Sequence, residues 1–403
     1  MTRRGGARAA PARGRCVRAA AVARGAPGLL AALLLAGCAT TRLDKARSQF
    51  YAGNIAQAQA KLEGAPSDSK DRVLFLMERG MIRQSGADYQ GSIRDWLEAG
   101  DTAEQLDYLS VSRSSASMVA NDWVLSFRGE RYERTLLHAF AAKSYLALGA
   151  WDDAAVEARR IARALENLNG FPDDPYSHYL AGACFKLIDD ASGAALEYGK
   201  ASRLLPALQV DAATGRIAAP SGAAAGGAAA SPAARAGPPA ELVCFVLIGR
   251  SAAKGEMWAP NSQWGVAPYA EIYAGDRCLG RSYPLTNTQR LIELTRQREA
   301  ALKAAKTAAR IVIKDAVAHN LSERNDLLGS LAWLALFAME TPDTRRWETL
   351  PMHLGVARVP CPADLREFKI VFKGSGGNVV SQRVVTAPLS RRGNVYVSFC
   401  RAM

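Results

Sequence analysis

The sequence has no uninterrupted apolar run close to the roughly 20 residues that a membrane-spanning helix needs. This argues against a protein that crosses a bilayer as several helices. Aromatic side chains are also scarce, at 7% of 403 residues, and they are not interleaved with basic ones as in a single-stranded nucleic-acid binder. By contrast, 49% of the residues are hydrophobic and 22% are charged, which excludes disordered and collagen-like chains. We therefore expect most of the chain to fold.

The first 37 residues lack acidic side chains entirely but contain seven arginines. The formal net charge of the whole chain is +13, so removal of this segment leaves +6 (13 − 7). The remaining charge is spread over both halves of the chain, whereas a nucleic-acid binder gathers it on one face. We expect no nucleic-acid partner.

Patterns that indicate catalysis are few. Ser251 and Lys254 match the S-x-x-K pattern of penicillin-recognising enzymes, but Ser67 and Lys70 match it too, and the companion K-T-G is absent. A short pattern that occurs twice in one chain is best explained by chance. The four histidines show no metal-ligand spacing and are expected on helix surfaces or partly buried: His138, His178, His319 and His353. The sequence predicts no catalytic residue, no metal site and no cofactor.

Residues 1–37 have the order of a secretory signal peptide, with an arginine-rich start, a short apolar run and small residues before a cysteine. The segment Leu35-Ala36-Gly37-Cys38 resembles the lipobox of bacterial lipoproteins. That resemblance implies cleavage before Cys38 and acylation of its thiol, and Ala39 then favours the outer over the inner membrane. This segment does not encode the leaflet, and we expect the periplasmic face. Several acyl chains make a stable membrane anchor where one would be marginal. The alternative is a chance cysteine at the end of an ordinary signal peptide.

Residues 38–206 read as amphipathic helices that repeat. A turn at Gly53-Asn54-Ile55 precedes a short helix, the pattern recurs 34 residues on from Ala58 to Ser92, and a further copy begins at Gly149. Small residues at these spacings allow close helix contact, and large ones fill the groove between helices. The spacings resemble those of tetratricopeptide repeats, and the predicted packing residues are Gly80, Tyr89, Ser92, Trp96, Gly182, Phe185, Ala194, Tyr198 and Pro206.

Stacked repeats bury a continuous core and leave a concave surface that binds a peptide or a partner helix. The helical half is therefore predicted to recruit a protein. The alternative is a spacer that holds the rest of the chain away from the membrane.

Residues 207–240 are predicted to be a flexible linker, because the stretch from 221 to 240 consists almost wholly of Ala, Gly, Ser and Pro. We expect the two flanking domains to move independently. Residues 241–403 are predicted to form an α+β domain. Its strands are expected at Leu242–Ile248, Tyr269–Tyr273, Cys278–Tyr283, Phe368–Phe372, Val379–Val385 and Val395–Phe399, with helices at Thr288–Ala318 and Leu327–Met339. The second of these helices has 13 apolar-rich residues, which favours a buried core helix over membrane insertion, the alternative.

After this helix comes a segment with Asp343, Arg345, Arg346 and Trp347. We interpret it as a corner between a helix and a strand, where Asp343 caps or pairs with an arginine and Trp347 closes the core; a ligand site is the alternative. Together with the lipobox, the repeats and the terminal β segment, it resembles a family of uncharacterised bacterial tetratricopeptide-repeat lipoproteins. The resemblance implies architecture and membrane attachment, and no activity.

Seven cysteines become five once Cys16 leaves with the signal peptide and Cys38 is lipidated. Cys184 falls within a repeat helix and is predicted to be a buried free thiol. The other four fall on or beside predicted strands, in a compartment that favours disulfides, with three possible pairings: Cys244, Cys278, Cys361 and Cys400.

These observations predict a multi-domain lipoprotein, anchored to the membrane, that acts as a protein-binding scaffold in the bacterial cell envelope. Two alternatives stay open: an envelope hydrolase or transferase with its site in the C-terminal domain near Trp347, and a purely structural spacer. Converging carboxylates or a Ser/Lys pair in a pocket would favour the enzyme, and an open repeat groove with an apolar floor would favour the scaffold.

Overall fold

The computed structural model describes residues 42–64, 70–112, 126–218, 240–251, 267–302, 304, 345–387 and 389–403. Leu43–Met403 forms one compact unit. Several predictions fall on residues outside the described ranges: the cleavage and lipidation residues Leu35, Ala36, Gly37 and Cys38, the motif residue Asp343, and the helix expected at Leu327–Met339.

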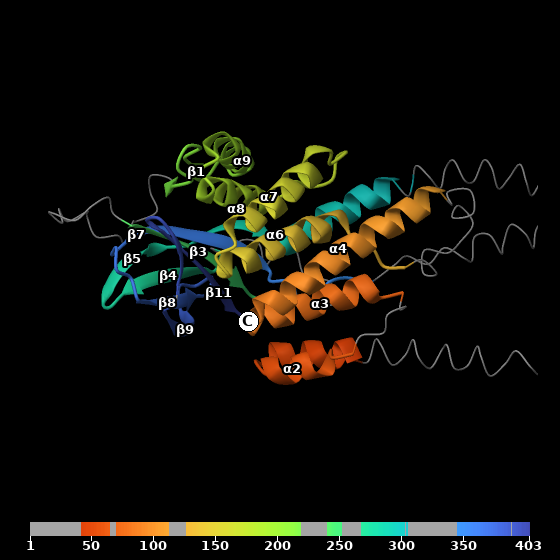
Figure 1. Ribbon diagram of the computed structural model, residues 1–403, viewed down its shortest axis with the longest axis horizontal. Coiled ribbons are helices and arrows are strands. Elements are labelled where there is room, and N and C mark those ends of the chain that lie inside the picture. The colour runs from red at the N-terminus through yellow and green to blue at the C-terminus, as the bar shows by residue number, and fades with distance from the viewer. Residues whose placement is uncertain are drawn as a thin grey trace, which may run out of the picture. The chain divides into compact units, whose positions relative to one another are not determined.

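The first half of this unit is helical (Figure 1). Residues 42–51 form the first helix. The next helices are α2 (Ile55–Lys61), α3 (Arg72–Ser85), α4 (Tyr89–Ser112), α6 (Arg131–Ala147), α7 (Trp151–Glu166), α8 (Pro175–Leu187) and α9 (Ala191–Leu204). They form four hairpins of consecutive helices, as the sequence predicted.

The four hairpins share one turn geometry. The second residue after the first helix of each hairpin has a positive φ, at Gly53, Ala87, Gly149 and Asp189. In each case the next N–H donates to the carbonyl five residues earlier, at 2.9 to 3.0 Å: Asn54 to Gln49, Asp88 to Arg83, Ala150 to Tyr145 and Asp190 to Phe185. This is the Schellman arrangement that ends helices. Four copies of one turn support an internal repeat more strongly than the degenerate sequence does.

Two hairpins also repeat a polar contact. His138 of α6 hydrogen bonds Glu157 of α7, and His178 of α8 hydrogen bonds Glu197 of α9, at 2.8 and 2.5 Å. Both pairs are 19 residues apart, and the second is displaced by 40 residues from the first. The structure therefore has an array of related helix hairpins, and their assignment to the tetratricopeptide family stays a prediction.

Two sheets follow. The five-stranded sheet has the order β10-β11-β3-β7-β6 and the four-stranded sheet the order β5-β4-β8-β9. The strands are β3 (Ala240–Ile248), β4 (Tyr269–Ala274), β5 (Arg277–Arg281), β6 (Tyr283–Asn287), β7 (His353–Cys361), β8 (Glu367–Lys373), β9 (Val379–Thr386), β10 (Ser390–Arg392) and β11 (Val395–Ala402). β3 and β11 pair in parallel, and the other pairings are antiparallel. The expected strands correspond to β3, β4, β5, β8, β9 and β11, although the one expected at Cys278–Tyr283 ends at Arg281. Strands β6, β7 and β10 and the short strands of the expected linker were missed, and residues 288–302 of the first expected helix are helical.

The five-stranded sheet is the middle layer of the unit. Side chains alternate across β3, so Val243, Phe245 and Leu247 join the core of the helices while Leu242, Cys244 and Val246 join the core under the four-stranded sheet. This explains why β3 is a continuous apolar run, because both of its faces are covered.

The expectation that the two halves move independently is wrong. One hydrophobic core runs from Leu43 in the first helix to Val397 in the last strand. The expected linker also begins with ordered chain, since β1 (Gln209–Val210) pairs with β2 (Ile217–Ala218) and Val210 is buried in the same core. The coarse α-plus-β architecture is correct, with the helical half packed against the sheet.

Candidate functional site

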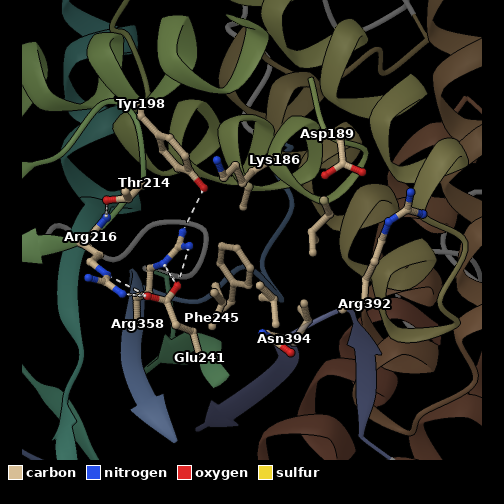
Figure 2. Close-up of a pocket in the computed structure, with 16 residues that line it drawn as sticks. Lys186, Asp189, Tyr198, Thr214, Arg216, Glu241, Phe245, Arg358, Arg392 and Asn394 are labelled. Carbon is tan, nitrogen blue, oxygen red and sulfur yellow. Dashed lines mark hydrogen bonds and ion pairs between the residues drawn. The ribbon is translucent and has the colours of Figure 1, made fainter. Parts of the chain in front are cut away.

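A cavity of about 550 Å³ lies where the last helix hairpin meets the five-stranded sheet (Figure 2). This volume is within the range of small-ligand and peptide side-chain sites. Helices α8 and α9 and the loop between β1 and β2 form its walls, and β3, β7 and β11 form its floor. The site therefore exists only because both halves of the chain contribute to it.

The floor is apolar for a simple geometric reason. Val243 and Phe245 of β3 and Val395 and Val397 of β11 lie on the sheet face toward the helices, because alternate residues of a strand share a face. Val397 pairs directly with Val243 in the parallel register. Leu187 of α8 closes the apolar surface from above. A ligand on this floor would be held by contacts without directional bonds.

One side of the cavity carries a carboxylate between two arginines. Glu241 accepts hydrogen bonds from Arg216 at 2.7 Å and from Arg358 at 2.8 and 3.0 Å, while Arg358 also donates to the Tyr198 hydroxyl at 3.3 Å (Figure 2). Burial alone would raise the pKa of Glu241, but the charge of Arg358 and the hydrogen bonds from both arginines hold it below its ordinary value. Glu241 is therefore a permanent carboxylate and unsuited to act as a general acid.

The remaining charged groups leave the cavity positive. Lys186 is exposed and Arg392 is half-buried, and neither has an ion-pair partner among the described residues. Four cations line the cavity, Lys186, Arg216, Arg358 and Arg392, against two acids, Asp189 and Glu241, so the net charge of the lining is +2 (4 − 2). An anionic group would enter with favourable electrostatics and find the apolar floor beneath it.

Of the two acids in the cavity lining, Glu241 and Asp189, only Glu241 is paired with arginines, and the lining contains no Ser/Lys pair. Among the described residues, no group of three or more His, Cys, Asp or Glu side chains is arranged to hold a metal ion. In the same part of the chain, no helix has the length and apolarity to cross a membrane.

The segment at Arg345, Arg346 and Trp347 lies elsewhere and fastens the two halves together. Trp347 is fully buried, with its ring 5.2 Å from Trp96 and 5.6 Å from Phe140, both in repeat helices. Arg345 pairs with Asp71 at 2.7 Å. Arg346 is buried, and its pKa is lowered by desolvation and by the charge of Arg296. The prediction that Trp347 closes the core is confirmed, but the core that it closes belongs largely to the helices.

Two buried acids complete this junction, and the sequence analysis missed both. Glu78 of α3 accepts the N–H groups of Glu348 and Thr349 at 2.8 and 3.2 Å, and Glu133 of α6 accepts the N–H of Trp347 at 2.7 Å. Burial, opposed by that hydrogen bond, raises the pKa of Glu133 to about 7. Both acids lie in helices, and their hydrogen-bond partners are distant in the sequence. No local sequence pattern therefore predicts their role.

The predicted repeat residues behave as packing residues. A Cβ at Gly80 would lie 3.0 Å from the Trp96 ring, and one at Gly182 would lie 2.8 Å from the Tyr198 ring. Ser92, Phe185 and Ala194 are buried, Tyr89 is half-buried, and Pro206 is exposed just after α9 ends. Tyr198 has a second role that its spacing did not indicate, as a wall of the cavity.

The five described cysteines are free thiols, so the structure contains no bridge in support of the expected disulfides. Cys184 is buried, as predicted. Cys244 and Cys400 lie in the same hydrophobic cluster on neighbouring strands, and a hydrogen bond between their thiols raises the pKa of Cys244 and lowers that of Cys400.

Of the histidines, His178 departs from expectation, because it is almost completely buried between Asp173 and Glu197. His138 and His353 are half-buried, as expected, and His319 lies outside the described ranges. Burial alone would lower the pKa of His178, but hydrogen bonds to the two carboxylates and their charges raise it to about 9.

Comparison with known proteins leaves the site to be interpreted on its own geometry. The chain has no significant match among protein-family models, curated proteins or solved structures.

Proposed function

We propose that this chain is a lipoprotein, anchored through Cys38 to the periplasmic face of the bacterial outer membrane, that acts as a scaffold for a protein partner. The lipobox resemblance supports the anchor. Attachment to a membrane confines a bound partner and raises its effective concentration without new contacts.

The partner does not use the inner surface of the repeats in this proposal. Helices α3, α4 and α6 already hold the chain's own C-terminal half, through Glu78, Glu133 and the aromatic contact of Trp347 with Trp96 and Phe140. Tyr176 and Tyr179 of α8 likewise pack against Phe245 of β3. A surface that is filled from within is not open to another protein.

We place recruitment at the cavity, where a short segment of the partner would bind. The observation that carries this assignment is the apolar floor beneath a lining of net charge +2. A peptide with apolar side chains and a carboxylate, either an acidic residue or a free C-terminus, matches both features. Lys186 and Arg392 would meet the carboxylate, and Val243, Phe245 and Val397 would meet the apolar side chains.

The test is photocross-linking in intact cells from residue 394, which is exposed in the turn beside Arg392. A photoreactive side chain replaces Asn394, and the cross-linked product is identified by mass spectrometry. We expect a protein adduct that falls at least tenfold when Lys186→Glu and Arg392→Glu are combined. The matched control combines Arg203→Glu and Arg159→Glu, which make the same total charge change at exposed residues of α9 and α7 outside the cavity.

Two outcomes would contradict recruitment at the cavity. An adduct that survives the double substitution, or no protein adduct at all, would remove the cavity as the recruiting site and leave the spacer interpretation. The anchor is tested separately by metabolic labelling with a palmitate analogue, which should mark the wild-type chain and leave Cys38→Ser unmarked. Deletion of residues 44–206 is unsuitable, because it would remove most of the shared core.

A further inference from the structure

One strand of the four-stranded sheet has an unprotected edge. β9 lies at the end of the order β5-β4-β8-β9, and within the described residues it pairs only with β8. Seven of its eight residues are exposed, including Val379, Val380 and Val384, each with more than half of its surface accessible. A strand edge presents a row of unpaired N–H and C=O groups that another strand can pair with.

The other three edge strands of the two larger sheets carry the usual protection. β5 has five residues with an arginine at each end and an irregularity in its pairing. β10 has three residues, two of them arginines. β6 contains Pro284 and a register shift, and its Thr286 contacts the start of α8. Charge, proline, bulges and short length all discourage edge pairing.

β9 carries one of these devices, a register shift at Val379–Ser381 in its pairing with β8, and its pairing is regular from Ser381 to Thr386. Its sequence is VVSQRVVT, with one charge, no proline and no lysine. The single charge, Arg383, is engaged within the chain, where its side chain donates to the Arg401 carbonyl at 2.5 Å. Valine is among the residues that pair best across strands. Since natural sheets rarely expose such an edge, its retention indicates a partner strand.

The sequence of β9 is also symmetric about Gln382. Read outward from that residue, Ser381 and Arg383 are followed on both sides by two valines, Val380 with Val379 and Val384 with Val385. In an antiparallel pair of two copies centred on Gln382, each valine on one side faces a valine from the other copy, and Arg383 faces a serine. No like charges meet. Such self-complementarity is what a two-fold interface requires.

We propose that β9 is a self-association surface, on which β9 of a second copy of this chain pairs antiparallel about a two-fold axis at Gln382. The two four-stranded sheets become one eight-stranded sheet, and the three exposed valines are covered. One strand pair buries less area than the roughly 1,200 Å² at the lower limit of stable complexes. We therefore expect a weak dimer, with a dissociation constant of about micromolar or above.

Cysteine cross-linking tests the axis directly, with the full-length chain in mild non-ionic detergent. In Gln382→Cys the two introduced thiols face each other across the axis, so a copper–phenanthroline oxidant should join them into a covalent dimer. Thr386→Cys is the control on the same strand, because its two copies lie eight residues apart, roughly 27 Å. The wild-type chain gives the background from the native cysteines.

A charged residue introduced on β9 tests the interface through its effect on the dissociation constant of the dimer. Val384→Lys places a lysine on the pairing surface twice in each dimer, and sedimentation equilibrium should show at least a tenfold weaker dimer than in the wild type. Val156→Lys is the matched control, since Val156 is an exposed valine on α7. Circular dichroism checks that both variants fold.

The results divide cleanly. A covalent dimer at residue 382 and not at 386, with weaker association in Val384→Lys, supports the proposal. Equal cross-linking at the two positions, no cross-linking at residue 382, or an unchanged dimer in Val384→Lys would overturn it. Neither measurement depends on the cavity or on lipidation, so the proposed recruiting function can fail while this surface stands.

Discussion

At the scale of residues, two glycines set how closely the helices of a hairpin approach. Gly182 of α8 faces the fully buried ring of Tyr198 in α9, and a Cβ there would lie only 2.8 Å from that ring. A buried aromatic ring packed on all sides cannot move aside cheaply, because protein interiors are close-packed. The glycine is required by the contact itself, since its φ is ordinary for a helix.

Gly182→Ala should therefore destabilise the protein by about 1 to 2 kcal/mol, even though alanine favours a helix by up to about 1 kcal/mol. Gly199→Ala in α9 is the matched control. No atom lies within 4 Å of a Cβ at Gly199, so that variant should gain roughly 0.5 to 1 kcal/mol. Urea unfolding of the chain with Cys38→Ser measures both, and two effects of the same sign would contradict the packing argument.

His178 gives the protein a dependence on pH. Its folded pKa of about 9 exceeds the ordinary value of 6.5, because Asp173 and Glu197 favour the imidazolium against the effect of burial. The stabilisation is fully present below pH 6.5 and is lost as the pH rises through 9. A shift of this size corresponds to on the order of 3 kcal/mol.

Replacement by His178→Gln should remove that dependence. The difference in unfolding free energy between wild type and variant is expected to shrink by a few kcal/mol from pH 6 to pH 9.5. Urea titrations at several pH values in this range measure it. Parallel curves for the two chains would show that His178 does not titrate in this window.

Sequence spacing predicted Gly80, Trp96, Gly182 and Tyr198 because the contact between two helices of a hairpin is local and recurs along the chain. It could not predict Glu78 and Glu133, whose N–H partners lie 270 and 214 residues away. An acidic residue in a helix is predicted from sequence to lie on the surface unless its buried hydrogen-bond partner is known. The cavity could not be predicted for the same reason, since Arg216, Glu241 and Arg358 come from three separate segments.

At the scale of elements, the segment at residues 346–349 is held by one buried acid more than by any other group. Glu78 is fully buried and accepts hydrogen bonds from Arg47 at 2.7 and 2.9 Å as well as from two backbone N–H groups. Its removal leaves the Arg47 guanidinium and both N–H groups with less compensation in a site closed to water. The loss of a buried hydrogen-bond acceptor and counter-charge strongly lowers the free energy of unfolding.

Glu78→Leu should cost about 3 to 5 kcal/mol of unfolding free energy. Glu98→Leu, which breaks a half-exposed pair with Arg72 in the same hairpin, should cost no more than about 1 kcal/mol. Chemical denaturation of both variants measures the difference. Similar losses would mean that the 346–349 segment contributes little to holding the two halves together.

The positions of the cysteines on β3 and β11 predict which disulfide forms first. Cys244 lies opposite Ser398 and Cys400 lies opposite Val246, so the two thiols are diagonal neighbours on β3 and β11, on the same face. A hydrogen bond between the two thiols raises the pKa of Cys244 and lowers that of Cys400, so the fold brings these two sulfurs into contact. Refolding with oxidised glutathione should form a bridge between Cys244 and Cys400 before any that involves Cys278 or Cys361, as read by mass spectrometry of alkylated peptides. A first bridge at Cys278 or Cys361 would refute this order.

Strand prediction succeeded where β-branched residues were dense and failed at β7. That strand contains Gly355 and ends near Pro360, both of which argue against a central strand by composition. The fold requires the glycine at residue 355, because a Cβ there would lie 2.6 Å from the Tyr283 carbonyl oxygen of the neighbouring strand β6. The glycine marks a close approach between strands, which only the folded register can show.

At the scale of the whole molecule, composition misled the expectation of two independent domains. An Ala/Gly/Ser/Pro segment indicates a tether, but it carries no information about whether the surfaces on either side of it fit each other. Both faces of β3 are apolar, which shows that both must be covered without showing by what. Here the helices cover one face and the four-stranded sheet the other, so the tether joins two parts of a single core.

A cut in the tether should therefore leave the protein intact. We expect a chain with a protease site inserted after Ala230 to be cleaved into two fragments that still elute together at about 1 µM, because Trp347 and the residues around Phe245 remain buried against the helices. The fragments should separate only in denaturant, and the same cut in Glu78→Leu should weaken their association. Size-exclusion chromatography with mass detection reads both results. Fragments that separate in native buffer would restore the two-domain interpretation and, with it, an open inner surface on the repeats.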